Sequence, residues 1–140
     1  MNPETEKCVI VIDENLPIGI IANTAAILGM TLGKRMPELV GVDVFDKDGG
    51  QHLGIIEIPL PILKTSPDNL KELRAKLYDA AYADLFTVDF SDLAQSCKVY
   101  EDYRNKMAGT SQSDLAYWGI AICGEKKKVS RLTGSLPLLR

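Results

Sequence analysis

The chain has 140 residues, of which 46% are hydrophobic and 25% are charged, and both values are ordinary for a globular protein. Its 19 acidic and 16 basic residues give a formal net charge of −3, which argues against a general attraction to nucleic acid or anionic lipid. The length predicts a single domain over residues 1–140. No apolar run approaches the roughly 20 residues that cross a bilayer.

The cysteine content bounds the chemistry and the compartment. Cys8, Cys97 and Cys123 are three in number and form no C-x-x-C pair, which argues against a disulfide framework and a structural zinc site. We therefore predict no metal or other cofactor, and a reducing cytoplasm as the location. The polar, acidic segment 1–7 lacks the features of a signal peptide.

The first elements are predicted from apolar pattern and proline placement. Residues 8–12 form a mostly β-branched run that ends at Asp13, which is typical of a strand buried on both faces. Residues 18–34 follow Pro17 and have the length and the Ala, Leu and Met content of a helix. This helix is apolar on nearly all sides, so we expect it to be buried rather than to lie on the surface.

A hairpin is predicted next. Residues 40–46 alternate between apolar and polar, the turn residues Asp48–Gly50 follow, and residues 52–60 read as the return strand. Pro59 and Pro61 should end the pairing, because proline cannot donate a hydrogen bond to a strand ladder.

The second half continues the alternation of strands and helices. Ser66 and Pro67 begin a helix that extends to about residue 83, since a capping hydroxyl is followed by proline at the first helical position. The remaining predicted elements are a strand at 84–90, a helix at 93–109, a strand at 115–124, a helix at 125–134 and an apolar tail at 135–140 that returns onto the body. This order predicts an α/β fold, a three-layer α/β/α sandwich around a mixed sheet of four to five strands.

The C-terminal stretch GIAICGEKKKVSRLTGSLPLL resembles the C-terminal signature of type II peptidyl-tRNA hydrolases, in which an apolar strand, a short helix closing on Thr-Gly and an apolar tail follow one another. Other pieces fall in the family's order, among them the strand after Cys8, the helix from Pro17 and the strand TVDF. The chain resembles even more an uncharacterised bacterial family that shares this fold and has no assigned activity. The resemblance implies a peptidyl-tRNA hydrolase II-like fold.

The departures from the hydrolase family concern its active site. With the family's glutamine set opposite Asn23, its catalytic lysine falls on Gly19 and its histidine on Ala26, and neither residue can carry charge or move a proton. The family's aspartate corresponds to Asp89. The resemblance therefore implies one retained carboxylate without its cationic partner, and two interpretations stay open: lost catalysis, or an esterase with a rearranged site.

Two candidate site residues lie on the elements named so far. Asp89 is expected at the end of a strand, where α/β folds place groups that contact ligands, and it is a candidate catalytic base. The alternative is a carboxylate that accepts a hydrogen bond from the next helix start, at Ser91 or Asp92. Asn23 is a poor helix former in mid-helix, so it is a candidate ligand-binding residue, with a structural role in the core as the alternative.

Further candidates are Gln51, His52 and Lys128 as ligand-binding residues. His52 is the single histidine, and we interpret it as an exposed turn residue, with proton transfer as the alternative. Lys128 belongs to the basic run Lys126–Lys128, interpreted as a solvated helix face, with contact to tRNA phosphates as the alternative. Cys123 is interpreted as a small buried hydrophobe, with a nucleophile at a helix start as the alternative.

Together these observations favour a small cytoplasmic module that binds a ligand or partner beside Asn23 and Asp89 without hydrolysing it. A peptidyl-tRNA hydrolase with a rearranged site is the first alternative. A structural role is the second, with the tail at 135–140 packing within the chain or across a homodimer. The expected partner is a small ligand of unknown identity; tRNA is disfavoured, and a membrane is not expected.

Overall fold

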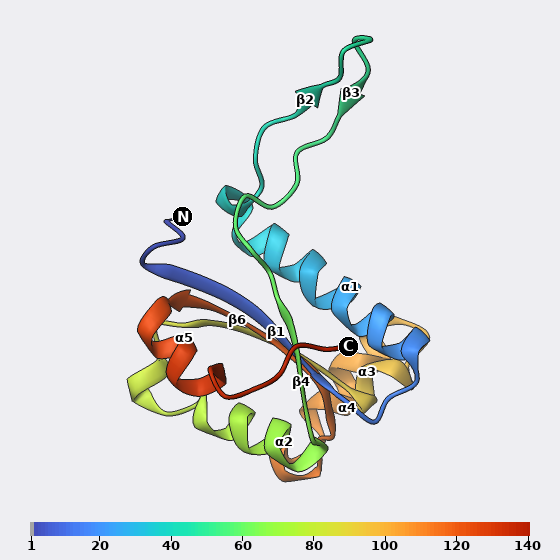
Figure 1. Cartoon of the computed structure of the whole chain (residues 1–140). Helices are drawn as coiled ribbons and strands as arrows, with labels where there is room; N and C mark the ends of the chain where they lie inside the picture. The colour runs from blue at the N-terminus through green and yellow to red at the C-terminus, as the bar shows by residue number, and fades with distance from the viewer. Residues whose placement is uncertain (1) are drawn as a thin grey trace.

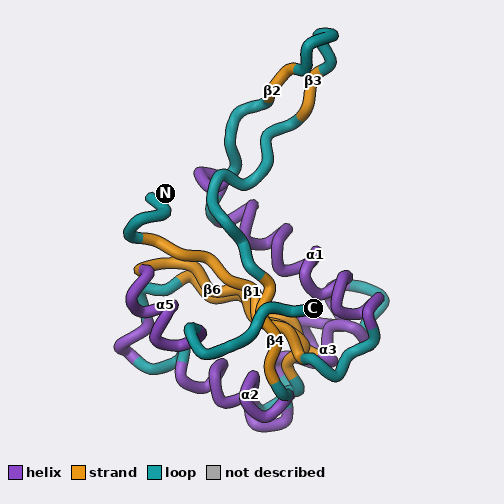
Figure 2. Tube along the Cα trace, in the orientation of Figure 1, coloured by secondary structure: helices purple, strands orange, loops and turns teal. Residues whose placement is uncertain are grey.

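A computed structural model describes residues 2–140 as a four-stranded sheet with helices on both faces and a separate projecting hairpin (Figures 1 and 2). Met1, which the predicted domain includes, lies outside the described residues. The strands are β1 (Glu6–Asp13), β2 (Val44–Phe45), β3 (Gln51–His52), β4 (Ile62–Thr65), β5 (Phe86–Ser91) and β6 (Tyr117–Glu125). The α-helices in this part of the chain are α1 (Ile18–Arg35), α2 (Pro67–Lys76), α3 (Asp92–Gln95), α4 (Tyr100–Ala108) and α5 (Lys126–Thr133).

The main sheet has the strand order β4-β1-β6-β5 and is mixed, as predicted. β1 pairs in parallel with β4 and antiparallel with β6, so that Val11 lies between Leu63 and Ile120. β1 is buried from Cys8 to Asp13, which explains why its sequence is a continuous apolar run rather than an alternating one.

Helix α1 covers one face of the sheet and packs closely on β6. The close approach depends on Gly119, because a Cβ atom there would lie 2.7 Å from Thr24 Cγ2 and 2.9 Å from Leu28 Cδ1. The buried residues of α1 are Thr24, Leu28 and Leu32. The outer face of the helix is uncovered, with Ile18 85% and Met30 80% exposed. The expectation of a buried helix is therefore wrong for the single chain.

Helices α2 and α5 cover the opposite face, where Leu70, Leu73 and Val129 pack against Val9 and Val11 of β1. The C-terminal tail returns onto the body, as predicted. Lys64 donates to the carbonyl of Pro137 at 3.0 Å, and Leu139 donates to the carbonyl of Ile62 at 2.9 Å. The tail thus covers the outer edge of β4, which would otherwise expose unpaired backbone groups.

The predicted hairpin forms a projecting arm, defined here as residues 40–56 (Figure 1). Its ladder is shorter than expected: only Val44 with His52 and Phe45 with Gln51 pair as strands, so the return strand over 52–60 is not formed. β4 follows after the two prolines and joins the main sheet instead.

Two predicted helices are shorter than expected. The helix expected to reach residue 83 ends at Lys76, and a 3-10 turn (Ala80–Tyr82) follows. The helix expected over 93–109 is divided into α3 and α4. At the end of α3, Ser96 Oγ and Cys97 Sγ both donate to the carbonyl of Leu93, so side chains bind this carbonyl where the helix stops.

Cys8 and Cys123 lie directly opposite one another on β1 and β6, with Cα atoms 4.2 Å apart, and are joined by a disulfide. The prediction that the cysteines form no disulfide is therefore wrong, and the argument for a reducing compartment loses its support. The two residues are 115 positions apart, so only the strand register reveals the pairing. Cys123 is buried, as interpreted, and Cys97 is free and half-buried.

Candidate functional site

Asp89 is held by an ion pair with Arg74. Arg74 Nε donates to Asp89 Oδ2 at 2.7 Å, and these side chains are only 13% and 21% exposed, less than in any other ion pair of residues 2–140. The guanidinium carbon of Arg74 lies 4.0 Å from the ring centre of Tyr78. The expectation of a carboxylate without a cation is thus wrong, because α2 supplies the cation that α1 lacks. Asp89 has this partner rather than the role of a helix cap.

The strand register explains why α2 can reach this carboxylate. Val88 and Phe90 belong to the apolar cluster beneath α1, whereas Asp89 lies opposite Ile120, whose cluster is covered by α2. Because side chains alternate along a strand, Asp89 projects toward α2. Asn23, on α1, lies beyond the other face of the sheet.

Two buried hydroxyls lie on the same strand pair. Tyr117 Oη and Ser91 Oγ have no hydrogen-bond partner within residues 2–140, and the two residues are opposite one another in the β5–β6 ladder. Burial raises the pKa of Tyr117, and the negative charge of Asp89 raises it further. Tyr117 therefore stays neutral near pH 7 and keeps its proton for donation.

A cavity of about 390 Å³ lies along β5, between α1 and the α3–α4 segment. Its volume falls within the range of pockets that hold small molecules. The walls are mainly apolar, with polar groups at a few positions. The lining residues are Ile27, Thr31, Val88, Asp89, Phe90, Ala94, Cys97, Lys98, Val99, Tyr100 and Tyr103.

Tyr103 and Asp89 give this cavity its polar character. Burial raises the pKa of Tyr103, and the charge of Asp89 raises it further, so Tyr103 is a neutral donor near pH 7. The rings of Tyr100 and Tyr103 meet edge to face with centroids 5.4 Å apart. Cys97 Sγ contacts the backbone carbonyl of Leu93 at 3.3 Å rather than a basic side chain. The arrangement can hold a mostly apolar molecule by stacking and a small number of hydrogen bonds.

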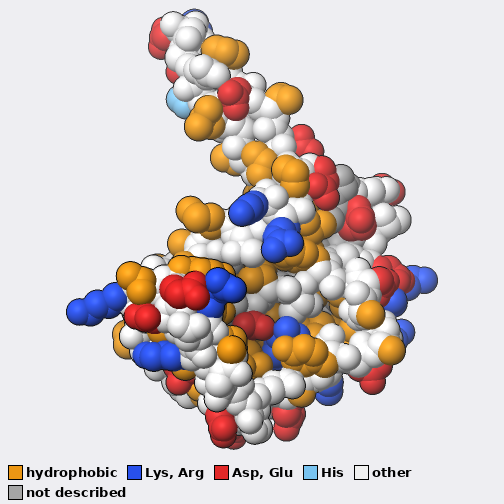
Figure 3. All heavy atoms as spheres, turned by 180° about the vertical axis from the view of Figure 1, so that it is seen from behind, with side chains coloured by type: hydrophobic (Ala, Val, Ile, Leu, Met, Phe, Trp, Pro, Cys, Tyr) orange, Lys and Arg blue, Asp and Glu red, His pale blue; other side chains and the backbone are white. Residues whose placement is uncertain are grey.

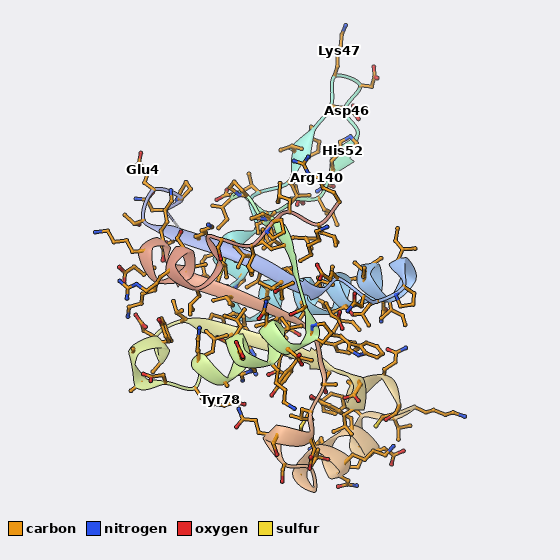
Figure 4. All side chains as sticks on the ribbon, turned by 60° about the horizontal axis from the view of Figure 1, so that its bottom comes forward. Glu4, Asp46, Lys47, His52, Tyr78 and Arg140 are labelled. Atoms are coloured by element: carbon orange, nitrogen blue, oxygen red, sulfur yellow. A yellow bond between two sulfur atoms is a disulfide. The ribbon has the colours of Figure 1, made fainter. Side chains whose placement is uncertain are left out.

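The other residues predicted for the site do not converge on the cavity. Asn23 is exposed on α1 and is not among the lining residues. On the arm, Gln51 Nε2 donates to Asp43 Oδ2 at 2.8 Å, and His52 Nε2 lies 2.8 Å from Asp46 Oδ2. Figure 4 shows His52 and Asp46 on the arm, remote from Tyr78 on the body.

The basic run has a local partner. Lys128 Nζ lies 2.9 Å from both carboxylate oxygens of Asp84, and this contact lowers the pKa of Asp84. Lys128 therefore points to the loop before β5 rather than to Asp89. Within residues 2–140, no group of three or more His, Cys, Asp or Glu side chains is placed to hold a metal ion. No helix in that range is long and apolar enough to cross a membrane.

Sequence reasoning missed Arg74, although a signal was present. Arg74 directly follows Leu73, a buried residue of α2, so Arg74 lies at the border of the helix face that packs on the sheet. It also precedes Tyr78 by four positions, the spacing that brings two side chains together on a helix. The partner strand could not be inferred in the same way, because the Arg74–Asp89 contact depends on tertiary packing.

These features define a small α/β protein with a ligand-sized cavity at the edge strand of its sheet. The chain belongs to the family described as protein of unknown function DUF2000, which matches residues 6–140. A solved structure of a protein of unknown function from Agrobacterium tumefaciens is similar, with a TM-score of 0.87 and 16% identity over 100% of both chains. A comparison with curated proteins finds no match. The likeness to the solved structure is one of fold alone.

Proposed function

We propose that the protein binds a small ligand in the cavity beside Asp89, on a scaffold of the peptidyl-tRNA hydrolase II type. The observation that carries the proposal is a cavity of ligand size whose mainly apolar lining includes Asp89 and the hydrogen-bond donor Tyr103. A mostly apolar pocket with a few polar groups is typical of sites that bind small molecules.

The chemistry of the wall limits the class of ligand. Arg74 balances the charge of Asp89, and the remaining charged residue of the lining, Lys98, is exposed to solvent, so the interior of the cavity does not present a strong net charge. Tyr103 can donate a hydrogen bond, and Tyr100 and Phe90 offer aromatic surface. These groups fit a neutral or zwitterionic molecule with an aromatic or aliphatic body and one or two polar groups.

The test is a fragment screen by protein-observed NMR with neutral, cationic and anionic aromatic fragments. We expect neutral fragments to shift the amide signals of cavity residues, and Thr31→Phe to abolish these shifts by filling the space. Ala108→Phe, on an exposed position of α4 outside the lining, serves as the control and should bind as the wild type does. Shifts that persist unchanged in Thr31→Phe would place the binding elsewhere and refute the proposal.

The presence of a cation, Arg74, beside Asp89 motivates a second candidate function, hydrolysis of the ester of peptidyl-tRNA. Such a reaction needs an oriented water and a donor for the charge that builds on the carbonyl oxygen. Asp89 could orient the water, and Arg74 would supply the positive charge that Gly19 cannot. The ion pair opposes this function, because Arg74 already donates to Asp89.

A peptidyl-tRNA cleavage assay separates the two functions. If the hydrolase function is correct, the wild type cleaves the ester and Arg74→Met loses about 10²–10³ in rate, as for removal of one charge-stabilising donor. If the binding function is correct, the wild type and Arg74→Met both leave peptidyl-tRNA intact. Retardation of tRNA on gels, weakening steeply with salt, would independently favour the hydrolase.

A further inference from the structure

Most of the exposed large hydrophobic side chains of residues 2–140 lie in two places, the outer face of α1 and the arm. Figure 3 shows hydrophobic side chains along the arm and around its base. On α1 they are Ile18 and Met30, whereas Ile27, which is 37% exposed, lines the cavity instead. On the arm they are Val40, Val42, Val44, Phe45, Leu53 and Ile55.

These side chains expose a large apolar area. At roughly 100–150 Å² of exposed surface each, the eight residues offer about 1,000 Å² per chain, divided between the arm and α1. An isolated two-stranded hairpin is also marginally stable, and the arm has two ladder pairs and one further bridge, between Val40 and Ile56 at its base. Both observations indicate that something covers this surface.

The arm is apolar on both faces. Val44 and Phe45 are adjacent in β2, so their side chains point to opposite sides of the hairpin. An arm that lies along one surface of a partner covers the apolar residues on the side that faces this surface.

The occupant that fits best is a second copy of this chain. We propose that two copies pair about a two-fold axis, with the arm of each lying along the outer face of the other's α1. The chain carries both halves of such an interface, as a two-fold contact requires. The estimated 1,000 Å² per copy is the upper limit of the apolar area that this contact covers, and it is comparable with the roughly 800 Å² that each partner contributes to a standard interface.

The lengths of the two elements agree. Each leg of the arm has about eight residues, which reach about 25 Å when extended. The 18 residues of α1 span about 27 Å. One arm can therefore follow one helix from end to end.

The charges agree as well. The arm is acidic, with Asp43, Asp46 and Asp48 against Lys47, whereas α1 has no acidic residue and ends in Lys34 and Arg35. An acidic arm is attracted to the basic end of a partner's helix and is repelled by anionic lipid and nucleic acid.

The pairing of two copies does not depend on the proposed ligand, because the contact between arm and helix needs no occupant in the cavity.

Sedimentation velocity between 1 and 100 µM tests the pairing. We expect a dimer for the wild type, and a dimer dissociation constant raised by at least about tenfold in Leu53→Ser on the arm and in Met30→Ser on α1. Val99→Ser, an exposed valine outside both surfaces, is the matched control and should remain dimeric. Unchanged circular dichroism would show that the variants are folded. A monomeric wild type, or a dimer unaffected by both variants, would overturn the proposal.

Cross-linking then identifies the contact. In a Cys97→Ser background, chains with Leu53→Cys are mixed with chains with Met30→Cys and oxidised. We expect disulfides between unlike chains. Cross-links confined to pairs of Leu53→Cys chains would mean that arms meet arms and would overturn the assigned contact, as would a monomer that binds phosphatidylcholine vesicles through the arm.

Discussion

Tyr117 combines deep burial with an unsatisfied polar group, since it is 4% exposed and its hydroxyl lacks a partner within residues 2–140. A buried hydroxyl without a hydrogen bond costs free energy, so removing it should stabilise the fold. We predict that Tyr117→Phe raises the free energy of unfolding by about 1 kcal/mol in urea titrations. Ser130→Ala, whose hydroxyl lies near Lys7 Nζ, is a control that should not gain stability. A loss of stability in Tyr117→Phe would show that the hydroxyl is bonded in solution.

The same tyrosine gives the protein a pH dependence. Its pKa is raised above the ordinary value of 10.0 in the folded state, so the unfolded chain loses the proton first. Stability therefore falls as the pH rises through about 10, and the contribution vanishes below that value because both states are then protonated. We expect the decline above about pH 10 to be smaller in Tyr117→Phe. Equal declines in the two proteins would contradict the assignment to Tyr117.

Of the residues predicted for the site from sequence, Asp89 alone lines the cavity. The prediction rested on an expected strand end at Asp89, whereas β5 continues to Ser91 and Asp89 pairs with Ile120 inside it. Asn23 misled the prediction for a physical reason: its apolar neighbours on α1 suggested burial, whereas that side of the helix is uncovered. Arg74 could not be paired with Asp89 from sequence, since their contact joins separate elements.

At the scale of elements, two glycines differ in the space around them. Gly119 of β6 allows the close packing of α1, because a Cβ atom there would contact Thr24 and Leu28 of the helix. Nothing lies within 4 Å of a Cβ atom built at Gly29 of α1. We predict that Gly29→Ala stabilises the protein by about 0.5–1 kcal/mol, since alanine is the better helix former. Gly119→Ala should destabilise it by about 1–3 kcal/mol through overpacking. Chemical denaturation of the two variants checks both signs, and equal effects would contradict the close packing of α1.

The sequence predicts the elements whose pattern is local, and it fails where tertiary contacts decide. The buried run of β1 and the capped start of α2 at Ser66 are confirmed. Both features depend on residues that are close in the sequence, so a local pattern is sufficient to predict them. β4 is not predicted from the sequence, since it is only four residues long and directly follows the prolines at 59 and 61, which indicate the end of a strand. Its partner β1 lies about fifty residues earlier, beyond the reach of a local pattern.

At the scale of the whole molecule, the disulfide between Cys8 and Cys123 closes nearly the full chain. We predict that a maleimide labels one cysteine, Cys97, in the denatured protein without reductant, and three after reduction. Reduction should lower the free energy of unfolding by about 2–5 kcal/mol. The same loss should occur in Cys97→Ser, which keeps the bonded pair. Three labelled cysteines in the denatured, unreduced protein would contradict the disulfide.

The central pairing of β1 with β6 has a consequence for how the protein is made. β1 is synthesised before β6, and the paired residues Cys8 and Cys123 are 115 positions apart along the chain. During translation the apolar run of β1 therefore emerges long before its main partner exists. The sheet closes only after β6 has left the ribosome, and until then the apolar surface of β1 has no partner strand on that side.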